Sequence, residues 1–148
     1  MNYSLKFKRL HDDVILPEYA TEGSAGMDVR AYLKDEEWKI INPGDRMLVK
    51  TGLCADIPAG YELQVRPRSG LAMKYGITVL NSPGTIDSDY TDEIGIILIN
   101  HSLAQFKVHH DDRIAQFVLS KVDMLPIEEI DEIKKSDRGG GFGHTGVK

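Results

Sequence analysis

The sequence predicts an all-β fold, a sandwich or barrel of short strands with one short helix. Apolar and β-branched runs recur along the chain, and Gly, Pro, Asn or Asp break them at short intervals. The run from Ile96 to Ile99 is continuously apolar, which is typical of a strand covered on both faces. The length of 148 residues is that of one compact domain. We therefore expect a single β-sandwich or β-barrel domain.

The expected strands are short β-rich runs, each bounded by turn residues. In chain order they occupy residues 5–9, 27–31, 38–41, 46–53, 61–66, 77–80, 94–100, 106–109 and 114–122. One short helix is expected at residues 69–75, because Ser69 is a capping-type residue and Gly76 is a good terminator. We see neither an internal repeat nor an interdomain linker, so one domain is expected over residues 1–148.

The segment at residues 127–135 fits two structures. Ile127, Ile130 and Ile133 are three residues apart and would line one side of a helix. Pro126 precedes them, however, and a glycine-rich tail follows, so that three isoleucines form only a small apolar stripe. The alternative is an extended arm laid on a neighbouring subunit, and the periodicity alone does not decide between the two.

The glycine-rich tail at residues 138–148 has the properties of a lid over a nucleotide. Glycine exposes its backbone N–H groups and tolerates positive φ, so such a run can wrap a phosphate, while Phe142 can lie on a flat ring. A frayed terminus is the alternative. The chain then divides into a core of about residues 1–125, an arm of about 126–137 and this lid.

Composition excludes several classes of function. A formal charge of −5 argues against a basic face for long nucleic acid. No long apolar run and no signal peptide is present, so we expect a cytoplasmic protein without a membrane partner. Cys54 is the single cysteine, which excludes an internal disulfide and a multi-cysteine zinc site. Because Cys54 stands between apolar neighbours, we expect a buried, inert thiol.

Two polar segments are candidates for nucleotide binding. Arg68, Ser69 and Gly70 stand at the start of the expected helix, where free N–H groups attract phosphate, although a plain helix cap explains Ser69 equally well. A hairpin over residues 81–90 would bring Asn81, Asp87 and Tyr90 together, to read a base edge, hold a water and pack on a sugar. An ordinary turn is the alternative for this second segment.

Other polar residues are ambiguous in the sequence. Arg113 and Gln116 are three apart and therefore lie on opposite faces if their strand is regular, so that one of them can be structural. Asp28 follows a turn, where a capping aspartate is the usual explanation. The pair His109-His110 precedes two aspartates, but adjacent strand residues point to opposite faces, so we favour a solvated loop over a metal site.

Five segments, in this order, resemble the five motifs of the trimeric deoxyuridine triphosphate nucleotidohydrolase (dUTPase) family: residues 25–28, 67–70, 84–90, 112–116 and 138–146. Each segment alone is a weak signal, whereas five in order are specific. The resemblance implies a β jelly-roll homotrimer in which each active site takes residues from all three chains. It also implies hydrolysis of dUTP to dUMP and pyrophosphate with Mg²⁺, which keeps uracil out of DNA and supplies dUMP for thymidylate synthesis.

The resemblance also implies roles for matching residues. Asp87 would orient and deprotonate the water that attacks the α-phosphorus, and Tyr90 would stack on deoxyribose. Asn81 and the backbone of the hairpin would read uracil and exclude thymine and cytosine. The hairpin residues concerned are Gly84, Thr85 and Ile86.

The phosphate-binding roles fall on the remaining motifs. Arg68, Ser69 and Gln116 would contact the α- and β-phosphates, with Gly70 beside them, and Arg113 would brace the site. Asp28 would lie in the second shell of Mg²⁺ and reach it through water. In the tail, Phe142 would cover uracil and the γ-phosphate would be bound by Arg138, Gly143, His144 and Thr145.

Two residues depart from the family pattern. Asp92 stands where glycine is usual, and His144 stands where serine is common, so that protonation of His144 would make closure of the tail pH-sensitive. Two other functions compete with dUTP hydrolysis. One is a dCTP deaminase-like nucleotide enzyme, and the other is an interaction module whose partner binding is gated by the nucleotide.

Overall fold

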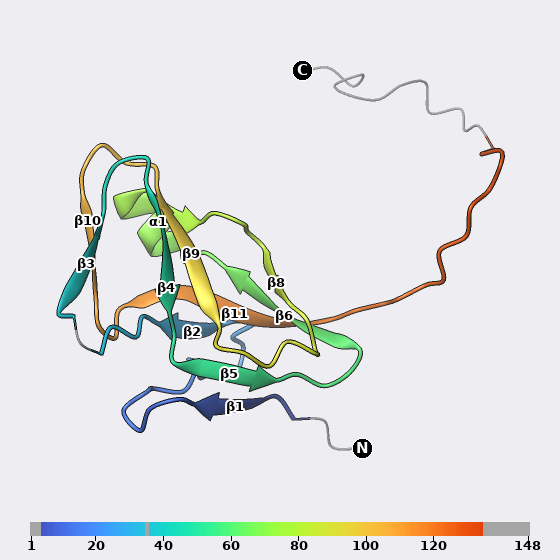
Figure 1. Ribbon diagram of the computed structural model, residues 1–148, viewed down its shortest axis with the longest axis horizontal. Helices are drawn as coiled ribbons and strands as arrows, with labels where there is room; N and C mark the ends of the chain where they lie inside the picture. Colours follow the sequence, from blue (N-terminus) through green and yellow to red (C-terminus); the bar gives the residue numbers. More distant parts are fainter. Residues whose placement is uncertain (1–3, 35, 135–148) are drawn as a thin grey trace.

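Short antiparallel strands build the protein, as the sequence predicts. The computed structural model describes residues 4–34 and 36–134 (Figure 1). Over these residues the elements are β1 Lys6–Arg9, β2 Met27–Arg30, β3 Trp38–Ile41, β4 Arg46–Lys50, β5 Leu53–Asp56, β6 Tyr61–Arg66, α1 Ser69–Tyr75, β7 Ile77–Val79, β8 Gly84–Ile86, β9 Gly95–Asn100, β10 Phe106–His109 and β11 Arg113–Lys121. The all-β prediction with one short helix is confirmed for this part of the chain.

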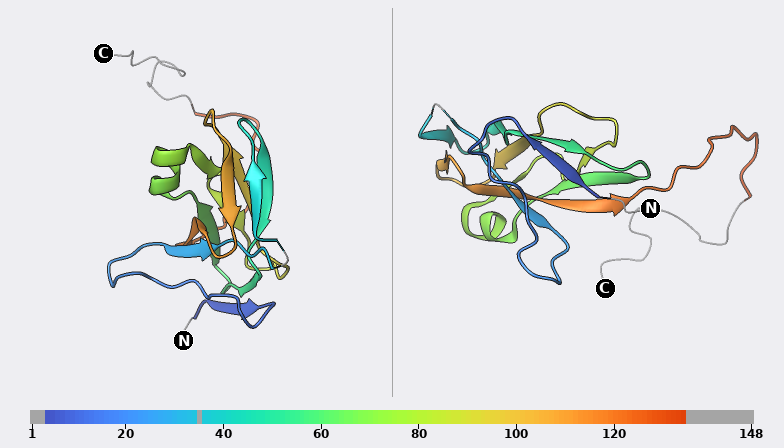
Figure 2. Two further views of the ribbon diagram at one scale, coloured as in Figure 1. Left: turned by 90° about the vertical axis from the view of Figure 1, so that its left-hand side faces the viewer. Right: turned by 90° about the horizontal axis from the view of Figure 1, so that it is seen from below.

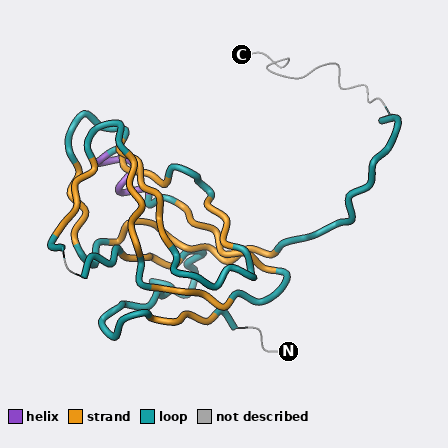
Figure 3. Tube along the Cα trace, viewed as in Figure 1, coloured by secondary structure: helices purple, strands orange, loops and turns teal. Residues whose placement is uncertain are grey.

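The strands of the described residues form four antiparallel sheets, which Figures 1 and 3 show as one β-rich body. The larger two have the strand orders β2-β11-β6-β8 and β4-β9-β7, and the smaller two pair β1 with β5 and β3 with β10. Figure 2 shows α1 to one side of the strands, where it leads directly into β7. None of the helices in the described ranges is long and apolar enough to cross a membrane.

The core lies between the inner faces of the two larger sheets. Phe117 and Leu63 from one sheet and Ile96 and Leu98 from the other are each 0% exposed. The ring of Phe7 in β1 stacks on Phe117 with ring centroids 6.0 Å apart, so that the β1-β5 sheet closes one end of the core. Burial of these apolar side chains is the main force that holds the layers together.

The predicted strand at residues 46–53 is divided into β4 and β5. Gly52 separates them with a φ of 68°, and a Cβ there would lie 2.6 Å from Cγ2 of Val14. The chain therefore turns sharply at a position that only glycine fits. As a result β4 pairs with β9, whereas β5 pairs with β1.

The expected hairpin over residues 81–90 is wrong as a pairing of two strands. β7 pairs with β9 in the three-stranded sheet, whereas β8, which the sequence did not reveal, pairs with β6 in the other sheet. The turn that contains Pro83 therefore carries the chain from one layer to the other. It still places Asn81, Gly84 and Asp87 in one short stretch of chain.

The ends of α1 match the prediction at one terminus only. Gly76 ends the helix in the left-handed conformation, with φ 64°, and its N–H faces the carbonyls of Leu71 and Ala72, as expected. The N-cap position, however, is Arg68, and Ser69 is the first helical residue rather than the cap. Among the described residues, no side chain makes a cap hydrogen bond there.

The arm leaves the body after β11 and does not form a helix over residues 127–134 (Figure 1). The helical alternative is therefore wrong for these residues. Its isoleucines are open to solvent in the single chain, with Ile127 fully exposed, Ile130 63% and Ile133 81% exposed. The alternative, an arm laid on a neighbouring subunit, stays a prediction, and the exposed isoleucines leave an apolar surface available for it.

Two burial predictions need correction. Cys54 is half-buried rather than buried. In β9, one face is buried, with Ile96 and Leu98 inside, while Ile97 and Ile99 on the other face are only half-buried. The second face of β9 is thus incompletely covered within one copy of the chain.

Candidate active site

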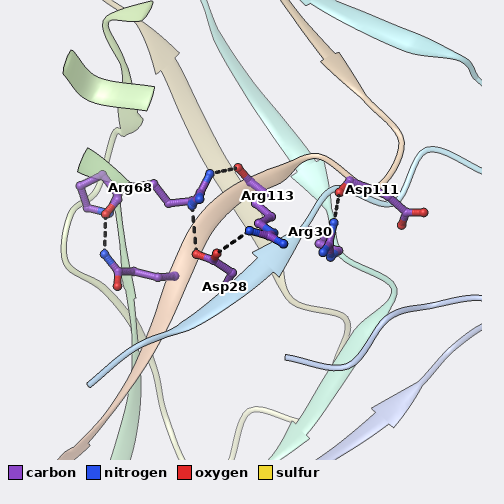
Figure 4. A network of polar contacts seen from close by, with 7 residues as sticks. Asp28, Arg30, Arg68, Asp111 and Arg113 are labelled. Carbon is purple, nitrogen blue, oxygen red and sulfur yellow. Dashed lines mark hydrogen bonds and ion pairs between the residues drawn. The ribbon is translucent and has the colours of Figure 1, made fainter. Parts of the chain in front are cut away.

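Three charged side chains meet on the face of β2 and β11 near the start of α1 (Figure 4). Nε of Arg68 donates to Oδ1 of Asp28 at 2.9 Å, and Nη1 of Arg113 lies 3.8 Å from Oδ2 of Asp28. Nη1 of Arg68 also donates to the carbonyl of Arg113 at 3.1 Å. The interpretation of Asp28 as a turn cap is therefore wrong, because its carboxylate holds two guanidinium groups.

A β-bulge in β11 decides which side chains share this face. Arg113 pairs with Arg30 and Ala115 pairs with Val29, so Ile114 is an extra residue between two regular pairs. Paired residues point to the same side of a sheet, and Gln116 pairs with Asp28. The strand is therefore not regular, which was the condition for placing Arg113 and Gln116 on opposite faces, and the bulge brings both to the side of Asp28.

Gln116 connects this face to the segment that enters α1. Its Nε2 donates to the carbonyl of Pro67 at 2.9 Å, and the side chain is half-buried. Ser69 and Gly70 follow Arg68 in the first turn of α1 and are both exposed. Residues from β2, β11 and the start of α1 thus lie together.

The two arginines border a large open cavity beside α1. Its volume is about 880 Å³, and Arg30 and Lys107 line it together with Arg68 and Arg113. Asp111 and Asp112 also line it, so the four basic side chains outnumber the acidic ones. The field of this cavity therefore favours an anionic ligand.

Arg30 is a cavity residue that the sequence reasoning missed. Its Nη1 donates to the carbonyl of Asp111 at 2.7 Å, which ties β2 to the turn before β11. The signal was available, because residues two apart in a strand share a face and Arg30 is two residues after Asp28. The carbonyl of Pro67, by contrast, is a backbone group that no sequence pattern marks.

The predicted uracil and water residues lie around β8. A cavity of about 150 Å³ is lined by Thr85, Ile86, Asp87, Tyr90, Ile94 and Gly95. Asp87 is exposed, and its carbonyl accepts a hydrogen bond from the N–H of Tyr90 at 3.1 Å. The hydroxyl of Tyr90 donates to the carbonyl of Glu93 at 2.9 Å, which fixes the direction of its ring.

Asn81 lies beside this strand. A Cβ added to Gly84 would be 3.3 Å from Nδ2 of Asn81 and 3.1 Å from Cβ of Val65. The absence of a side chain at Gly84 therefore leaves room for the Asn81 amide next to the backbone of β8. Asn81 itself is exposed.

The two groups of residues lie apart within one copy of the chain. In the ladders with β6, Gln116 pairs with Arg66, whereas Ile86 pairs with Leu63, so Asp87 lies at the level of Glu62. Four strand residues span roughly 13 Å. The groups also line different cavities. A single copy therefore does not place Asp87 opposite the arginines.

His109 lies at the turn between β10 and β11. His109 ends β10, and its N–H donates to Oδ2 of Asp112 at 2.8 Å across the turn. Within residues 4–34 and 36–134, no group of three or more His, Cys, Asp or Glu side chains is arranged to hold a metal ion. The tail residues lie outside the described residues: Arg138, Phe142, Gly143, His144 and Thr145.

Fold and site together define a class, a jelly-roll β protein that gathers basic and amide side chains on one sheet face. The dUTPase family profile matches residues 12–146. A deoxyuridine 5'-triphosphate nucleotidohydrolase from Clostridioides difficile is 50% identical over 145 residues, covering 97% of this chain and 99% of that protein. One from Desulfotalea psychrophila is 54% identical, covering 89% and 87%. The chain therefore belongs to the dUTPase family.

Solved structures agree on the fold. The dUTPase of Staphylococcus bacteriophage 80alpha with dUPNHPP superposes with a TM-score of 0.86 at 23% identity, covering 99% of this chain and 100% of that one. A mutant dUTPase from phage phi11 of S. aureus, described with a structural Mg(II) ion, gives 0.79 at 20% identity, covering 90% and 100%. At these identities the likeness concerns the fold alone.

Proposed function

We propose that the protein hydrolyses dUTP to dUMP and pyrophosphate. The observation that carries this proposal is the cluster in which Arg68, Arg113 and Gln116 share one face with Asp28. Relatives at about half identity over nearly the whole chain are named for this activity. Removal of dUTP would keep uracil out of DNA, and dUMP would supply thymidylate synthesis.

The phosphate end of the substrate would lie on the β2-β11 face. Arg68, Ser69 and Gln116 would bind the α- and β-phosphates, with the exposed backbone of Gly70 beside them. Arg113 would brace Arg68 through its carbonyl and through the shared carboxylate of Asp28. Charged and amide donors fixed in advance stabilise negative charge that grows on the leaving pyrophosphate.

The uracil end would lie against β8. This strand is at the edge of its sheet, so the backbone groups on its free side are available to a base edge. The proposed contacts are the backbone of Gly84, Thr85 and Ile86 together with the amide of Asn81. Tyr90 would stack on the sugar, and Asp87 would orient the water that attacks the α-phosphorus and accept its proton.

We propose a homotrimer with shared active sites, because one copy separates its phosphate residues from Asp87. The outer face of the β4-β9-β7 sheet supports association, since Leu48 there is 61% exposed and pairs with half-buried Ile97. The exposed isoleucines of the arm offer a second apolar contact. The tail would reach a third copy and contribute Arg138, Phe142, Gly143, His144 and Thr145.

Mg²⁺ is the proposed metal, and the donor set fits an indirect contact. Asp28 is a single carboxylate whose two oxygens already face Arg68 and Arg113, so a water-mediated contact fits better than direct coordination. When bound, Mg²⁺ neutralises triphosphate charge. The chain's own arginines and amides would then orient the phosphates.

The cytoplasmic location of the protein stays a prediction.

The test is release of pyrophosphate from dUTP, UTP, dTTP and dCTP, with and without Mg²⁺. We expect a strong preference for dUTP and a loss of turnover in Asp87→Asn with binding retained. Ammonia release from dCTP would instead indicate a dCTP deaminase, which the comparisons do not favour. Binding of dUTP without turnover, together with nucleotide-dependent capture of a protein, would indicate an interaction module.

A further inference from the structure

We propose that Gly26 is a positioning residue for Gln116. The missing side chain at Gly26 creates the space that the Gln116 amide occupies, and this space fixes the direction of the amide. The inference rests on the proposed role of Gln116 at the phosphates of the substrate. It assigns to Gly26 a task that involves no contact with the substrate.

The geometry leaves no room for a side chain at this position. A Cβ on Gly26 would lie 2.4 Å from Oε1 of Gln116, 3.3 Å from its Cδ and 3.5 Å from the carbonyl oxygen of Phe117. A contact of 2.4 Å is far below van der Waals distance, so one partner must move. The atom that must move is the far end of the Gln116 side chain, whereas the backbone contact with Phe117 is an ordinary one.

Steric space, and not backbone conformation, is the reason for glycine here. Among the described residues, the glycines with positive φ are Gly44, Gly52, Gly60 and Gly76. Gly26 is outside this set, so alanine can adopt its backbone conformation. A Gly26→Ala variant is therefore expected to fold and to displace only the Gln116 amide.

The direction of the amide follows from its other contact. The carbonyl of Pro67 only accepts hydrogen bonds, so Nε2 of Gln116 must face it, as observed at 2.9 Å. Oε1 then points toward Gly26. Three segments thus meet at one amide: the turn before β2, the strand β11 and the residue before Arg68. Because the amide is one planar group, a movement of Oε1 away from Gly26 also changes the direction of Nε2 toward Pro67.

The consequence for the reaction is a loss of preorganisation. A displaced Gln116 must be returned to its place by the substrate itself, which weakens transition-state binding. We expect Gly26→Ala to lower kcat/KM for dUTP by about tenfold to a hundredfold, the range for one contact to a charged group. Gly23→Ala is the matched control, because a Cβ at Gly23 meets nothing within 4 Å.

A double-mutant cycle tests the proposal. Gly26→Ala and Gln116→Ala are assayed singly and together, with thermal unfolding of each variant. We expect Gly26→Ala to change kcat/KM by less than about twofold in the Gln116→Ala background, because the amide it displaces is already gone. An equal loss in both backgrounds would overturn the inference.

The side-chain amide of Gln116 gives a second readout that does not depend on activity. Its ¹H–¹⁵N NMR signal, assigned by its disappearance in Gln116→Ala, should shift in Gly26→Ala and stay in place in Gly23→Ala. An unchanged signal in Gly26→Ala would also overturn the inference. If Gln116→Ala leaves kcat/KM unchanged, the proposed role of Gln116 fails, and the NMR signal still decides whether Gly26 positions the amide.

Discussion

Replacement of Asp28 by asparagine separates the charge of this side chain from its shape. In the unchanged protein, Nε of Arg68 lies 2.9 Å from Oδ1 of Asp28. The variant keeps an oxygen that can accept this hydrogen bond. It removes the negative charge that faces Arg68 and Arg113 together. Arg68 then keeps its bond to the carbonyl of Arg113, at 3.1 Å, but loses the ionic part of the contact that sets its direction.

The effects on stability and on turnover should differ in size. The side chains of Arg68 and Asp28 are 30% and 37% exposed, so solvent screens the pair and its loss costs about 1 kcal/mol of unfolding free energy at most. Looser placement of Arg68 should cost about 1.5–3 kcal/mol in the transition state, or roughly ten- to a hundredfold in kcat. KM should change less, because removal of the carboxylate also removes its repulsion of the triphosphate.

The assay is steady-state hydrolysis of dUTP combined with urea unfolding. Asp56→Asn is the matched control, since Nζ of Lys6 lies 2.9 Å from Oδ2 of Asp56 in a more exposed pair, at 67% and 70% exposure. This pair joins β1 to β5, away from the arginine cluster. If the kcat of Asp28→Asn lies within about twofold of the kcat of Asp56→Asn, the positioning role of Asp28 is refuted.

Two further predictions concern stability and titration. Asn100 is fully buried, and its Nδ2 donates to the carbonyls of Ile41 and Ala104 at 2.9 and 2.8 Å. Asn100→Ala should therefore lower the free energy of unfolding, measured in urea, by about 3 kcal/mol or more. A loss below about 1 kcal/mol would contradict this prediction. The hydroxyl of Tyr32 donates to Oδ1 of Asp13 at 3.0 Å and holds the pKa of Asp13 below its ordinary 3.8. The stabilisation is therefore fully present above pH 3.8 and is lost as the pH falls through the lowered pKa. Tyr32→Phe should raise the pKa of Asp13 in an NMR titration, and an unchanged pKa would show that the hydrogen bond is not its cause.

Local patterns in the sequence were sufficient to predict much of the secondary structure. Alternating burial along β2, with Met27 and Val29 inside, follows directly from alternating apolar and polar residues. The end of α1 was equally predictable, because Gly76 is in the left-handed conformation that glycine favours. The basic and amide candidates were selected from their resemblance to the family motifs, and the structure brings Arg68, Arg113 and Gln116 to one face.

Pairing between distant strands was not predictable in the same way. A short turn such as 81–83 fits a hairpin or a crossing between sheets equally well, and only the partners β9 and β6 decide. The helical alternative for residues 127–135 was misleading for a related reason. Its isoleucines have helical spacing, but a stripe of three apolar residues stabilises a helix only when it can pack, and the body of one copy offers it no partner within the described residues.

The bulge in β11 shows how a single inserted residue changes the function that a strand can support. In a regular strand, residues three apart lie on opposite faces. Either Arg113 or Gln116 would then point into the core. The extra residue Ile114 is buried with 1% exposure, which stabilises the bulge by apolar burial while Arg113 and Gln116 lie on the side of Asp28. One carboxylate on β2 can then hold both arginines and face the amide. The polar cluster therefore depends on an apolar residue that no motif reading would select as functional, and deletion of Ile114 should separate Arg113 from Gln116 even if β11 still pairs.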